Sequence, residues 1–255
     1  TADINLMLVA LLREMGFNAN PVILSTRSNG RFSKDYPLLS KFNGVVVHVA
    51  IRDKELLLDA TDPIGKFGML PFECLSGEGR LIAKQGKWIS LKSTERKNRS
   101  ITVNINILPT GQYKGQITQY FSGYSGVEER RKIASIGIEK FKNDLVKGNP
   151  DMQISDFEII NLDSTENALQ IKLSTLIGEE QEVDRLYLNP VFANRTISNP
   201  FKNINRIFPV DFGIPMDESY IANLTIPAGF MIEELPKNIA LSLPNGAAKF
   251  MYALQ

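Results

Sequence analysis

The feature that most constrains the fold is a pair of apolar segments, GVVVHVAI at 44–51 and LLLDAT at 56–61, separated only by the charged residues RDKE. Valine and isoleucine favour extended backbone because their branched side chains pack well on a pleated surface. Two such segments joined by a short polar connection are typical of an antiparallel β-hairpin. We therefore expect a sheet with a buried face, and the only histidine of the chain, His48, lies in its first strand.

A helix is predicted ahead of this hairpin, over DINLMLVALLREMGF at 3–17. Thr1 is expected to cap its start, and Gly16 is expected to end it in a left-handed conformation. Its predicted apolar face consists of Ile4, Leu8, Leu11, Leu12 and Met15. Further strands are expected at 21–26 and, as a second hairpin, within 80–91. The pattern predicts an α+β unit in which one helix packs on an antiparallel sheet.

A charged stretch, KSTERKNRS at 92–100, has the composition of a domain linker. We therefore divide the chain into one domain at 1–92 and a second at 97–255. Most of the second domain alternates between apolar and polar residues with period two, which predicts a β-rich domain with one packed helix.

The helix of the second domain is predicted to begin at a capping box formed by Ser125 and Glu128 and to stop at 148–150, Gly-Asn-Pro. Its predicted apolar stripe is Val127, Ala134, Ile138, Phe141 and Leu145. A hairpin is expected over 101–121, with its turn at 110–112. Later strands are expected at 154–163, 168–178, 182–189, 207–212, 218–227 and 238–244.

Composition excludes several kinds of partner and cofactor. The 29 basic and 28 acidic residues nearly cancel, which argues against nucleic acid as a partner. The single cysteine, Cys74, excludes an internal disulfide and a cysteine-built zinc cluster, and we expect no metal and no cofactor. The longest apolar run, at 6–12, is far shorter than the ~20 residues of a membrane-spanning helix. Both ends look cut, so we interpret the chain as a fragment of a longer protein.

Four stretches of the first domain together resemble a known family. They are TADINLMLVALLREMGFNANPVILSTRSNGR at 1–31, FNGVVVHVAI at 42–51, LLLDATD at 56–62 and FGMLPFECLSGEGR at 67–80. They resemble the second half of a transglutaminase-like (papain-like thiol enzyme) core, as found in bacterial multidomain proteins with flanking β-rich domains of unknown function. The resemblance covers about residues 1–92, and the region after 97 is similar to the trailing β-rich domain. It implies a location in the periplasm or at the cell surface.

The resemblance also indicates where a catalytic triad would lie. The family cysteine, at the start of the helix, aligns with Thr1; the histidine, which follows Phe-Asn, aligns with Gly44; and the aspartate aligns with Asp59. In such a triad the helix dipole favours the thiolate, histidine transfers the proton and aspartate orients the imidazole. Glycine offers no base and threonine is a far weaker nucleophile than a thiolate. We therefore expect a degenerate triad and no catalysis by it.

Three other residues are weighed as replacements. His48 lies on the same strand face as Gly44 but ~13 Å further along, beyond the ~3 Å that proton transfer requires. Cys74 follows LPFE in a loop and has no visible activator, so an inert thiol is the favoured interpretation. Thr1 could serve as the N-terminal nucleophile of an autoprocessed hydrolase, with its own amine as the base, but an end created by truncation or proteolysis is the simpler interpretation.

The sequence thus favours a non-catalytic scaffold that acts as a binding or assembly module for a protein, peptide or glycan. The rival is an active cysteine-protease or transglutaminase-like hydrolase or acyltransferase whose catalytic residues are relocated or supplied from outside. A shallow groove beside Thr1, Gly44 and Asp59 is the expected ligand site. The aromatic residues Tyr113, Tyr120, Phe121 and Tyr124 could form a binding face, although packing within the sheet is the favoured explanation for them.

Overall fold

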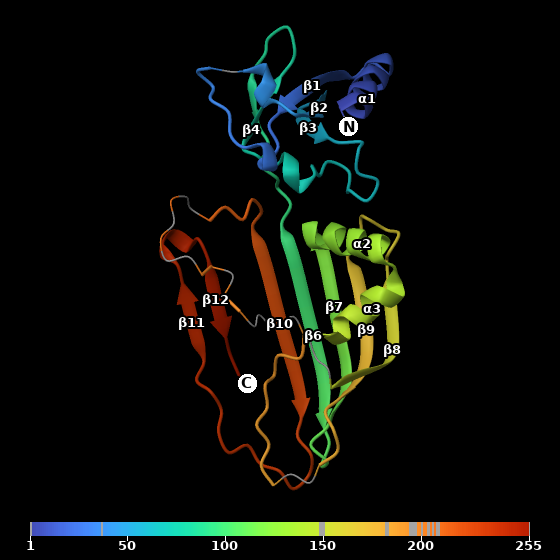
Figure 1. Cartoon of the computed structure of the whole chain (residues 1–255), viewed down its shortest axis with the longest axis vertical. Helices are drawn as coiled ribbons and strands as arrows, with labels where there is room; N and C mark the ends of the chain where they lie inside the picture. The colour runs from blue at the N-terminus through green and yellow to red at the C-terminus, as the bar shows by residue number, and fades with distance from the viewer. Residues whose placement is uncertain are drawn as a thin grey trace.

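The computed structural model describes residues 2–36, 38–147, 151–181, 184–193, 198–199, 201–202, 205, 207 and 210–254. These residues form an α+β structure rich in β-strand, as the sequence predicts. Two five-stranded sheets follow one another along the described chain, and a two-stranded hairpin comes after them (Figure 1).

The first sheet is antiparallel throughout, with the spatial order β3-β2-β1-β4-β5. Its strands are β1 (Asn18–Leu24), β2 (Gly44–Ile51), β3 (Lys54–Leu58), β4 (Glu78–Leu81) and β5 (Trp88–Ser90). Both predicted hairpins of this region are confirmed. The turn between β2 and β3 is shorter than the expected RDKE, because Ile51 pairs with Lys54 and only Arg52 and Asp53 lie between them. Glu55 therefore belongs to β3.

Helix α1 (Ala2–Glu14) covers the face of the first sheet that carries Val47 and Val49. It ends as predicted: Gly16 has φ +84°, and the amide of the residue after it donates a 2.9 Å hydrogen bond to the Leu12 carbonyl. This bond satisfies a carbonyl that the last helical turn would otherwise leave unpaired.

The predicted apolar face of α1 is only partly correct. Asn5 and Val9 are the buried residues, and Leu8 and Leu12 are half-buried. The other members of the predicted stripe, Ile4, Leu11 and Met15, are exposed. The helix is rotated because the Asn5 amide forms hydrogen bonds with backbone groups of the sheet, which a pattern of apolar residues does not register.

The second sheet has the spatial order β10-β6-β7-β9-β8 among the described residues. Its strands are β6 (Lys97–Ile107), β7 (Tyr113–Gly123), β8 (Met152–Ile160), β9 (Leu169–Ile177) and β10 (Met216–Thr225). The edge strand β10 runs parallel to β6, whereas the other pairings are antiparallel. The predicted linker is shortened to 92–96, because Lys97–Ser100 already belong to β6. The domain division at this point stays a prediction.

Two helices replace the single helix predicted between β7 and β8. They are α2 (Tyr124–Ile136) and α3 (Ile138–Lys147), separated by Gly137 with φ +82°. The predicted capping box is wrong, because Gly123 is the N-cap residue and no side chain caps the helix. The predicted stop at 148–150 lies outside the described residues.

Two predicted strands are not formed in the described residues. Of the predicted strands at 182–189 and 207–212, residues 184–189 and 210–212 have no regular structure. Residues 182, 183, 208 and 209 lie outside the described residues. Two apolar side chains of 184–193, those of Leu188 and Phe192, pack in the core of the second sheet instead. The last two strands, β11 (Ile239–Ser242) and β12 (Lys249–Tyr252), form an exposed hairpin of their own.

The buried cores connect the two sheets. One core lies beneath the face of the first sheet opposite α1 and includes Val22, Leu24 and Val46. Tyr124 and Val127 of α2 belong to this same core. In Figure 1, α2 lies at the end of the second sheet that is nearest the first. The first sheet is therefore covered by α1 on one face and, on the other, by the loop after β3 together with α2.

Candidate functional site

One end of the first sheet brings together the elements on which the predicted triad lies. The Asn5 side chain donates a 2.8 Å hydrogen bond to the Val45 carbonyl, at the start of β2. It also accepts a 2.9 Å hydrogen bond from the Ala60 amide, just after β3. The first turns of α1 are thus tied to the segments that contain Gly44 and Asp59. Thr1 itself lies outside the described residues.

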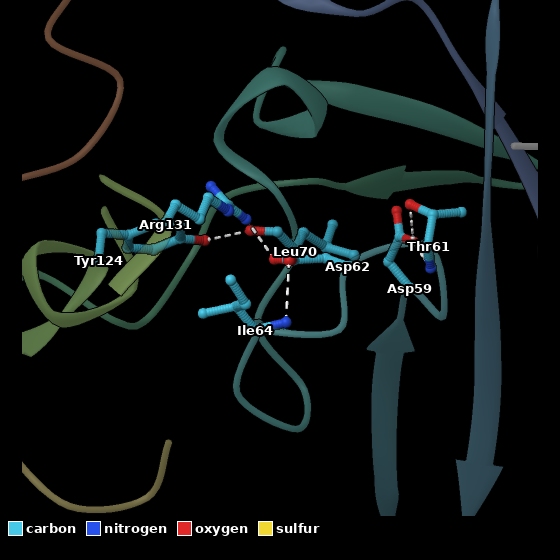
Figure 2. Close-up of polar contacts among 7 residues, drawn as sticks. All are labelled: Asp59, Thr61, Asp62, Ile64, Leu70, Tyr124 and Arg131. Atoms are coloured by element: carbon cyan, nitrogen blue, oxygen red, sulfur yellow. Dashed lines mark hydrogen bonds and ion pairs between the residues drawn. The ribbon is translucent and has the colours of Figure 1, made fainter. Parts of the chain in front are cut away.

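Asp59 forms a local turn with its neighbour. Its Oδ1 accepts a 2.7 Å hydrogen bond from the Thr61 amide and a 2.6 Å hydrogen bond from the Thr61 hydroxyl. Figure 2 shows this pair at the end of β3, facing away from the contacts made further along the loop. The carboxylate is engaged in stabilising the turn and has no imidazole as a hydrogen-bond partner among the described residues.

Gly44 does not leave the open space that the expected groove requires. A Cβ built at this position would lie 3.0 Å from Cδ1 and 3.3 Å from Cγ of Leu24. Leu24 is the residue paired with Gly44 across the sheet, and it is fully buried. The side of Gly44 on which a catalytic side chain would project is therefore occupied by the leucine.

His48 lies on the face of β2 opposite α1 and is only 4% exposed, so it is buried rather than half-buried as a surface strand residue would be. Its Cα pairs with Asn20 on one side and Leu57 on the other. Nε2 lies 3.5 Å from Oε2 of Glu55, and neither ring nitrogen has a hydrogen-bond partner among the described residues. The carboxylate beside the imidazole is therefore that of Glu55 and not that of Asp59.

Glu55 is held by a second group as well. The Lys87 ammonium donates a 2.6 Å hydrogen bond to Oε1 of Glu55. This bond, together with the charge of Lys87 and the proximity of His48, lowers the pKa of the Glu55 carboxyl below its ordinary value, against a smaller opposing effect of desolvation. The three side chains form a charged group at the outer side of the β2–β3 hairpin, close to the start of β5.

Cys74 ends a short 3₁₀ turn, Phe72–Cys74, in the core beneath the sheet. Burial, together with the negative charges of Asp59 and Glu73, raises the pKa of its thiol to about 12. At pH 7 the thiolate fraction is therefore on the order of 10⁻⁵. No hydrogen bond joins the thiol to His48 in the described structure. The structure thus does not bring the two replacement candidates, His48 and Cys74, into a nucleophile–base pair.

The loop after β3 contacts α2 directly (Figure 2). The Tyr124 hydroxyl donates a 2.7 Å hydrogen bond to the Leu70 carbonyl, and both groups are buried. Asp62 forms an ion pair with Arg131 and also accepts a 3.1 Å hydrogen bond from the Ile64 amide. These contacts fix the segment between Asp59 and Cys74 against the second sheet.

Most of the predicted aromatic face is not available for binding. Phe121 and Tyr124 are buried in the two cores, and Tyr113 is half-buried with its ring 5.5 Å from that of Phe192. Only Tyr120 is exposed, and its hydroxyl accepts a 3.2 Å hydrogen bond from Gln170. Three of these four aromatic residues are therefore packing residues: Tyr113 and Phe121 in the second sheet, and Tyr124 in α2 against the first core.

Two cavities lie next to the first sheet, away from Gly44 and Asp59. One has a volume of about 420 Å³ and is lined by His48, Glu55, Lys87 and the leucines beneath them. The other has a volume of about 490 Å³, and its charged lining residues are Arg27, Arg31, Lys34, Glu78, Asp211 and Lys92, the last of which also lines the first cavity. In the second cavity Arg27 pairs with Asp211 at 3.4 Å and Lys34 pairs with Glu78, so half of its cations are neutralised.

Neither metal ligands nor membrane spans are found in the part of the chain that the structure describes. There, no group of three or more His, Cys, Asp or Glu side chains is placed to hold a metal ion. No described helix combines the length and the apolar character needed to cross a bilayer.

The comparisons with known proteins identify one part of the chain. A family model described as a Domain of Unknown Function with solved-structure structure (DUF3858) matches residues 184–255. The match covers less than half of the chain and includes β10 and the β11–β12 hairpin. No curated protein and no solved structure matches the chain. Residues 184–255 therefore resemble a domain whose own function is not known, and β10 places part of that range within the second sheet.

Some residues of the site were missed by sequence reasoning. Glu55 falls in the expected RDKE turn, and Lys87 lies within the hairpin expected at 80–91, where no sequence pattern relates it to His48. With a two-residue turn at Arg52 and Asp53, His48 pairs with Leu57 across the hairpin, so both side chains lie on the same face of the sheet. Glu55 lies two residues before Leu57 in β3 and therefore also lies on this face. Lys87 comes close only through the fold of β4 and β5, and the sequence contains no local signal for it.

Proposed function

We propose that this chain is a non-catalytic, transglutaminase-like scaffold that acts as a binding or assembly module in a larger bacterial envelope protein. The observation that carries the proposal is the separation of the possible catalytic groups. The Cys74 thiol is buried with a raised pKa, the His48 ring lies beside Glu55, and Asp59 is engaged with Thr61. An acyl-transfer enzyme of this kind needs nucleophile, base and orienting carboxylate in mutual contact.

The transglutaminase-like part of the proposal is supported by the sequence stretches described above and by the arrangement of the first sheet. Asn5 ties the first turn of α1 to Val45 and Ala60, which are the neighbours of Gly44 and Asp59, the positions where the family histidine and aspartate are expected. The domain model that matches residues 184–255 is commonly found in transglutaminase-like proteins. The proposed location, in the periplasm or at the cell surface, rests on the resemblance alone.

An activity assay on the full chain tests the proposal. The protein is incubated with a glutamine-containing peptide and a primary amine, while released ammonia and peptide products are measured by mass spectrometry. A parallel sample is treated with iodoacetamide in buffer and in urea. We expect no turnover, and alkylation of Cys74 that is about 1000-fold slower in the folded than in the unfolded chain, because a thiol pKa near 12 leaves so little thiolate.

Specific outcomes would overturn the proposal. Turnover that is lost in Cys74→Ala or His48→Ala would establish a relocated dyad, and turnover lost in Thr1→Ala would establish the N-terminal nucleophile. Either result would favour the rival interpretation, an active hydrolase or acyltransferase. An active thiol enzyme serves as the positive control, and circular dichroism verifies that each variant is folded.

A further inference from the structure

The cavity beside His48 has a lining that differs between its inner and outer parts. It lies on the face of the first sheet opposite α1 and has a volume of about 420 Å³. Its inner wall is apolar and formed by Leu57, Leu70, Leu75 and Ile89, all of which belong to or pack against the buried core. Its outer part is formed by exposed charged residues. A volume of this size lies within the range of about 300–1,000 Å³ that is typical of sites for small molecules.

His48 gives this cavity a buried polar group with unused hydrogen-bonding capacity, because Nε2 lies 3.5 Å from Oε2 of Glu55 while Nδ1 has no neighbour of this kind among the described residues. The side chain is 6% exposed, and neither Nδ1 nor Nε2 forms a hydrogen bond within the described structure. Leaving a buried polar atom without a hydrogen bond is energetically unfavourable, so such atoms are uncommon in folded proteins. An imidazole with an unpaired Nδ1 on the wall of a leucine-lined cavity is placed to form a hydrogen bond with a polar atom of a molecule that enters it.

The charges around the cavity indicate the sign of that molecule. Glu55 and Lys87 form a close pair and neutralise each other. Lys92 also lines the cavity, its side chain is exposed, and it forms no ion pair with any described residue. One positive charge therefore remains without a counter-ion at the outer part of the cavity, which favours a ligand with one negative charge.

We propose that this cavity binds an apolar group that carries one carboxylate, with the apolar part against Leu57, Leu70 and Leu75, the carboxylate paired with Lys92, and His48 providing a hydrogen bond. The assignment rests on the proposed binding function and specifies its ligand class. Two sources share this chemistry: a free organic acid, and the last residue of a peptide with a free carboxyl terminus.

The composition of the chain provides two probes at the cavity. His48 is the only histidine and Trp88 the only tryptophan, and both line it. Binding to the full chain can therefore be followed by the single imidazole resonance in an NMR spectrum and by intrinsic tryptophan fluorescence. The acid arm uses 3-phenylpropanoate against 3-phenylpropanamide, and the peptide arm uses acetyl-Gly-Gly-Phe with a free against an amidated carboxyl terminus.

We expect a saturable shift of the His48 resonance with at least one free carboxylate, and an affinity about 10-fold lower for its amide. Lys92→Gln should lower the carboxylate affinity by about 10-fold. The matched control, Lys140→Gln, changes an exposed lysine of α3 that does not line the cavity and should have no effect. The compound whose binding saturates at the lower concentration, 3-phenylpropanoate or the free peptide, shows whether the ligand is an organic acid or a peptide carboxyl terminus.

Two results would overturn the proposal: no saturable shift with any of the four compounds, or equal affinity for acid and amide. Neither result bears on the proposed function, because binding and turnover are measured separately. Conversely, turnover in the activity assay would refute the non-catalytic function while leaving a measured carboxylate affinity intact.

Discussion

The Tyr124 hydroxyl, on the first turn of α2, donates a 2.7 Å hydrogen bond to the Leu70 carbonyl in the loop that leads from β3 to β4. Both residues are buried, and the bond spans 54 positions of the chain. Because α2 continues directly from β7, this contact connects the two sheets. It also holds the loop that forms part of the inner wall of the cavity beside His48.

Replacing Tyr124 by phenylalanine should therefore destabilise the protein although it removes a single oxygen atom. The Leu70 carbonyl would remain buried without a donor, and we expect the free energy of unfolding to fall by about 1–2 kcal/mol. Urea denaturation measures the change. The control is Tyr120→Phe, whose hydroxyl contacts Gln170 at an exposed position and should contribute less than about 0.5 kcal/mol. Equal effects of the two changes would contradict this account.

The ion pair between Asp62 and Arg131 should contribute less than the tyrosine contact. The Arg131 side chain is 40% exposed and that of Asp62 is 14% exposed, so solvent screens the attraction. A double-mutant cycle of Asp62→Asn and Arg131→Gln should give a coupling energy of about 0.5–1 kcal/mol. Asparagine keeps the acceptor for the Ile64 amide, so the cycle isolates the charge interaction.

A cross-strand pair provides the comparison for that cycle. Lys172 and Glu158 lie 3.6 Å apart at the surface of the second sheet, with exposures of 35% and 61%. The same kind of cycle there should give less than about 0.5 kcal/mol. If the coupling energy is larger for Lys172 and Glu158 than for Asp62 and Arg131, the interface between the sheets does not shield the Asp62–Arg131 ion pair from solvent.

The pattern of apolar, β-branched runs joined by short polar connections was enough to predict the hairpins, because such residues favour extended backbone and polar residues favour the turns between strands. It was enough for 44–51, which is β2 to the residue. It was not enough for the start of α2. Ser125 and Glu128 match the sequence of a capping box, but the chain enters the helix two residues earlier, through Gly123. The reason is tertiary: Gly123 passes against the backbone of Arg96, which no local pattern encodes.

This difference can be tested by three alanine substitutions. At Gly123 φ is +57°, and an added Cβ would lie 2.0 Å from the Arg96 carbonyl oxygen, so we expect Gly123→Ala to cost at least about 3 kcal/mol. Gly137 has a similar φ of +82° but nothing within 4 Å, so its alanine variant should cost about 1–2 kcal/mol through backbone strain alone. Ser125→Ala should cost less than about 0.5 kcal/mol, because Ser125 caps nothing. A cost of about 1 kcal/mol or more at Ser125 would restore the capping box.

Arg130 is a second residue whose role follows only from the fold. In the sequence it belongs to EERRK, which is typical of an exposed helix face, yet it is only 4% exposed. Its guanidinium donates hydrogen bonds of 2.6–3.0 Å to the carbonyls of Leu162, Asn161, Ser164 and Asn167, in the turn between β8 and β9. Burial lowers the pKa of the guanidinium from its ordinary value.

We expect Arg130→Met to destabilise the protein by about 3 kcal/mol, because four carbonyls lose their donor at once. The stability of Arg130→Lys should lie between that of Arg130→Met and that of the wild type, because an ammonium has three donors but lacks the planar geometry that reaches several carbonyls. Thermal or urea denaturation measures both. Lys140→Met, an exposed change on α3, is the control and should lie within about 0.5 kcal/mol of the wild type. An Arg130→Met variant as stable as this control would rule out the structural role.

The location of the candidate site was predictable only in part. The strand face of His48 followed from the alternation in 44–51, and the structure confirms it. The identity of its neighbour did not, because a shift of the hairpin turn by two residues decides whether Glu55 belongs to a turn or to β3. Nor could the sequence indicate that Leu24 occupies the space beside Gly44, since that contact depends on the pairing of β1 with β2.

The raised pKa of Cys74 makes a prediction about stability at alkaline pH. The pKa of the thiol is about 9 in the unfolded chain and about 12 in the folded protein, mainly because of burial. The folded state therefore holds the thiol proton more tightly than the unfolded state. The stabilisation that comes from the raised thiol pKa is complete below pH 9 and is lost as the pH rises from 9 toward 12. In the middle of this range the free energy of unfolding falls by about 1.4 kcal/mol per pH unit.

Urea denaturation at pH 8 and pH 10 should reveal this loss by comparison with Cys74→Ala. The variant leaves a small cavity and should be less stable than the wild type at pH 8. Because it has no thiol to ionise, the difference between the two proteins should shrink by about 1.4 kcal/mol at pH 10. Burial also raises the pKa of Tyr113 and Tyr220, but their ionisation affects both proteins equally and cancels in the difference. The pKa of Tyr124 is raised mainly by burial and also by the charge of an ionised Cys74, so this tyrosine is replaced by phenylalanine in both proteins for the comparison. If the difference in stability stays constant between the two pH values, Cys74 ionises as readily in the folded protein as in the unfolded chain. A thiol that ionises so readily would be accessible to solvent, and nucleophilic catalysis by Cys74 would again have to be considered.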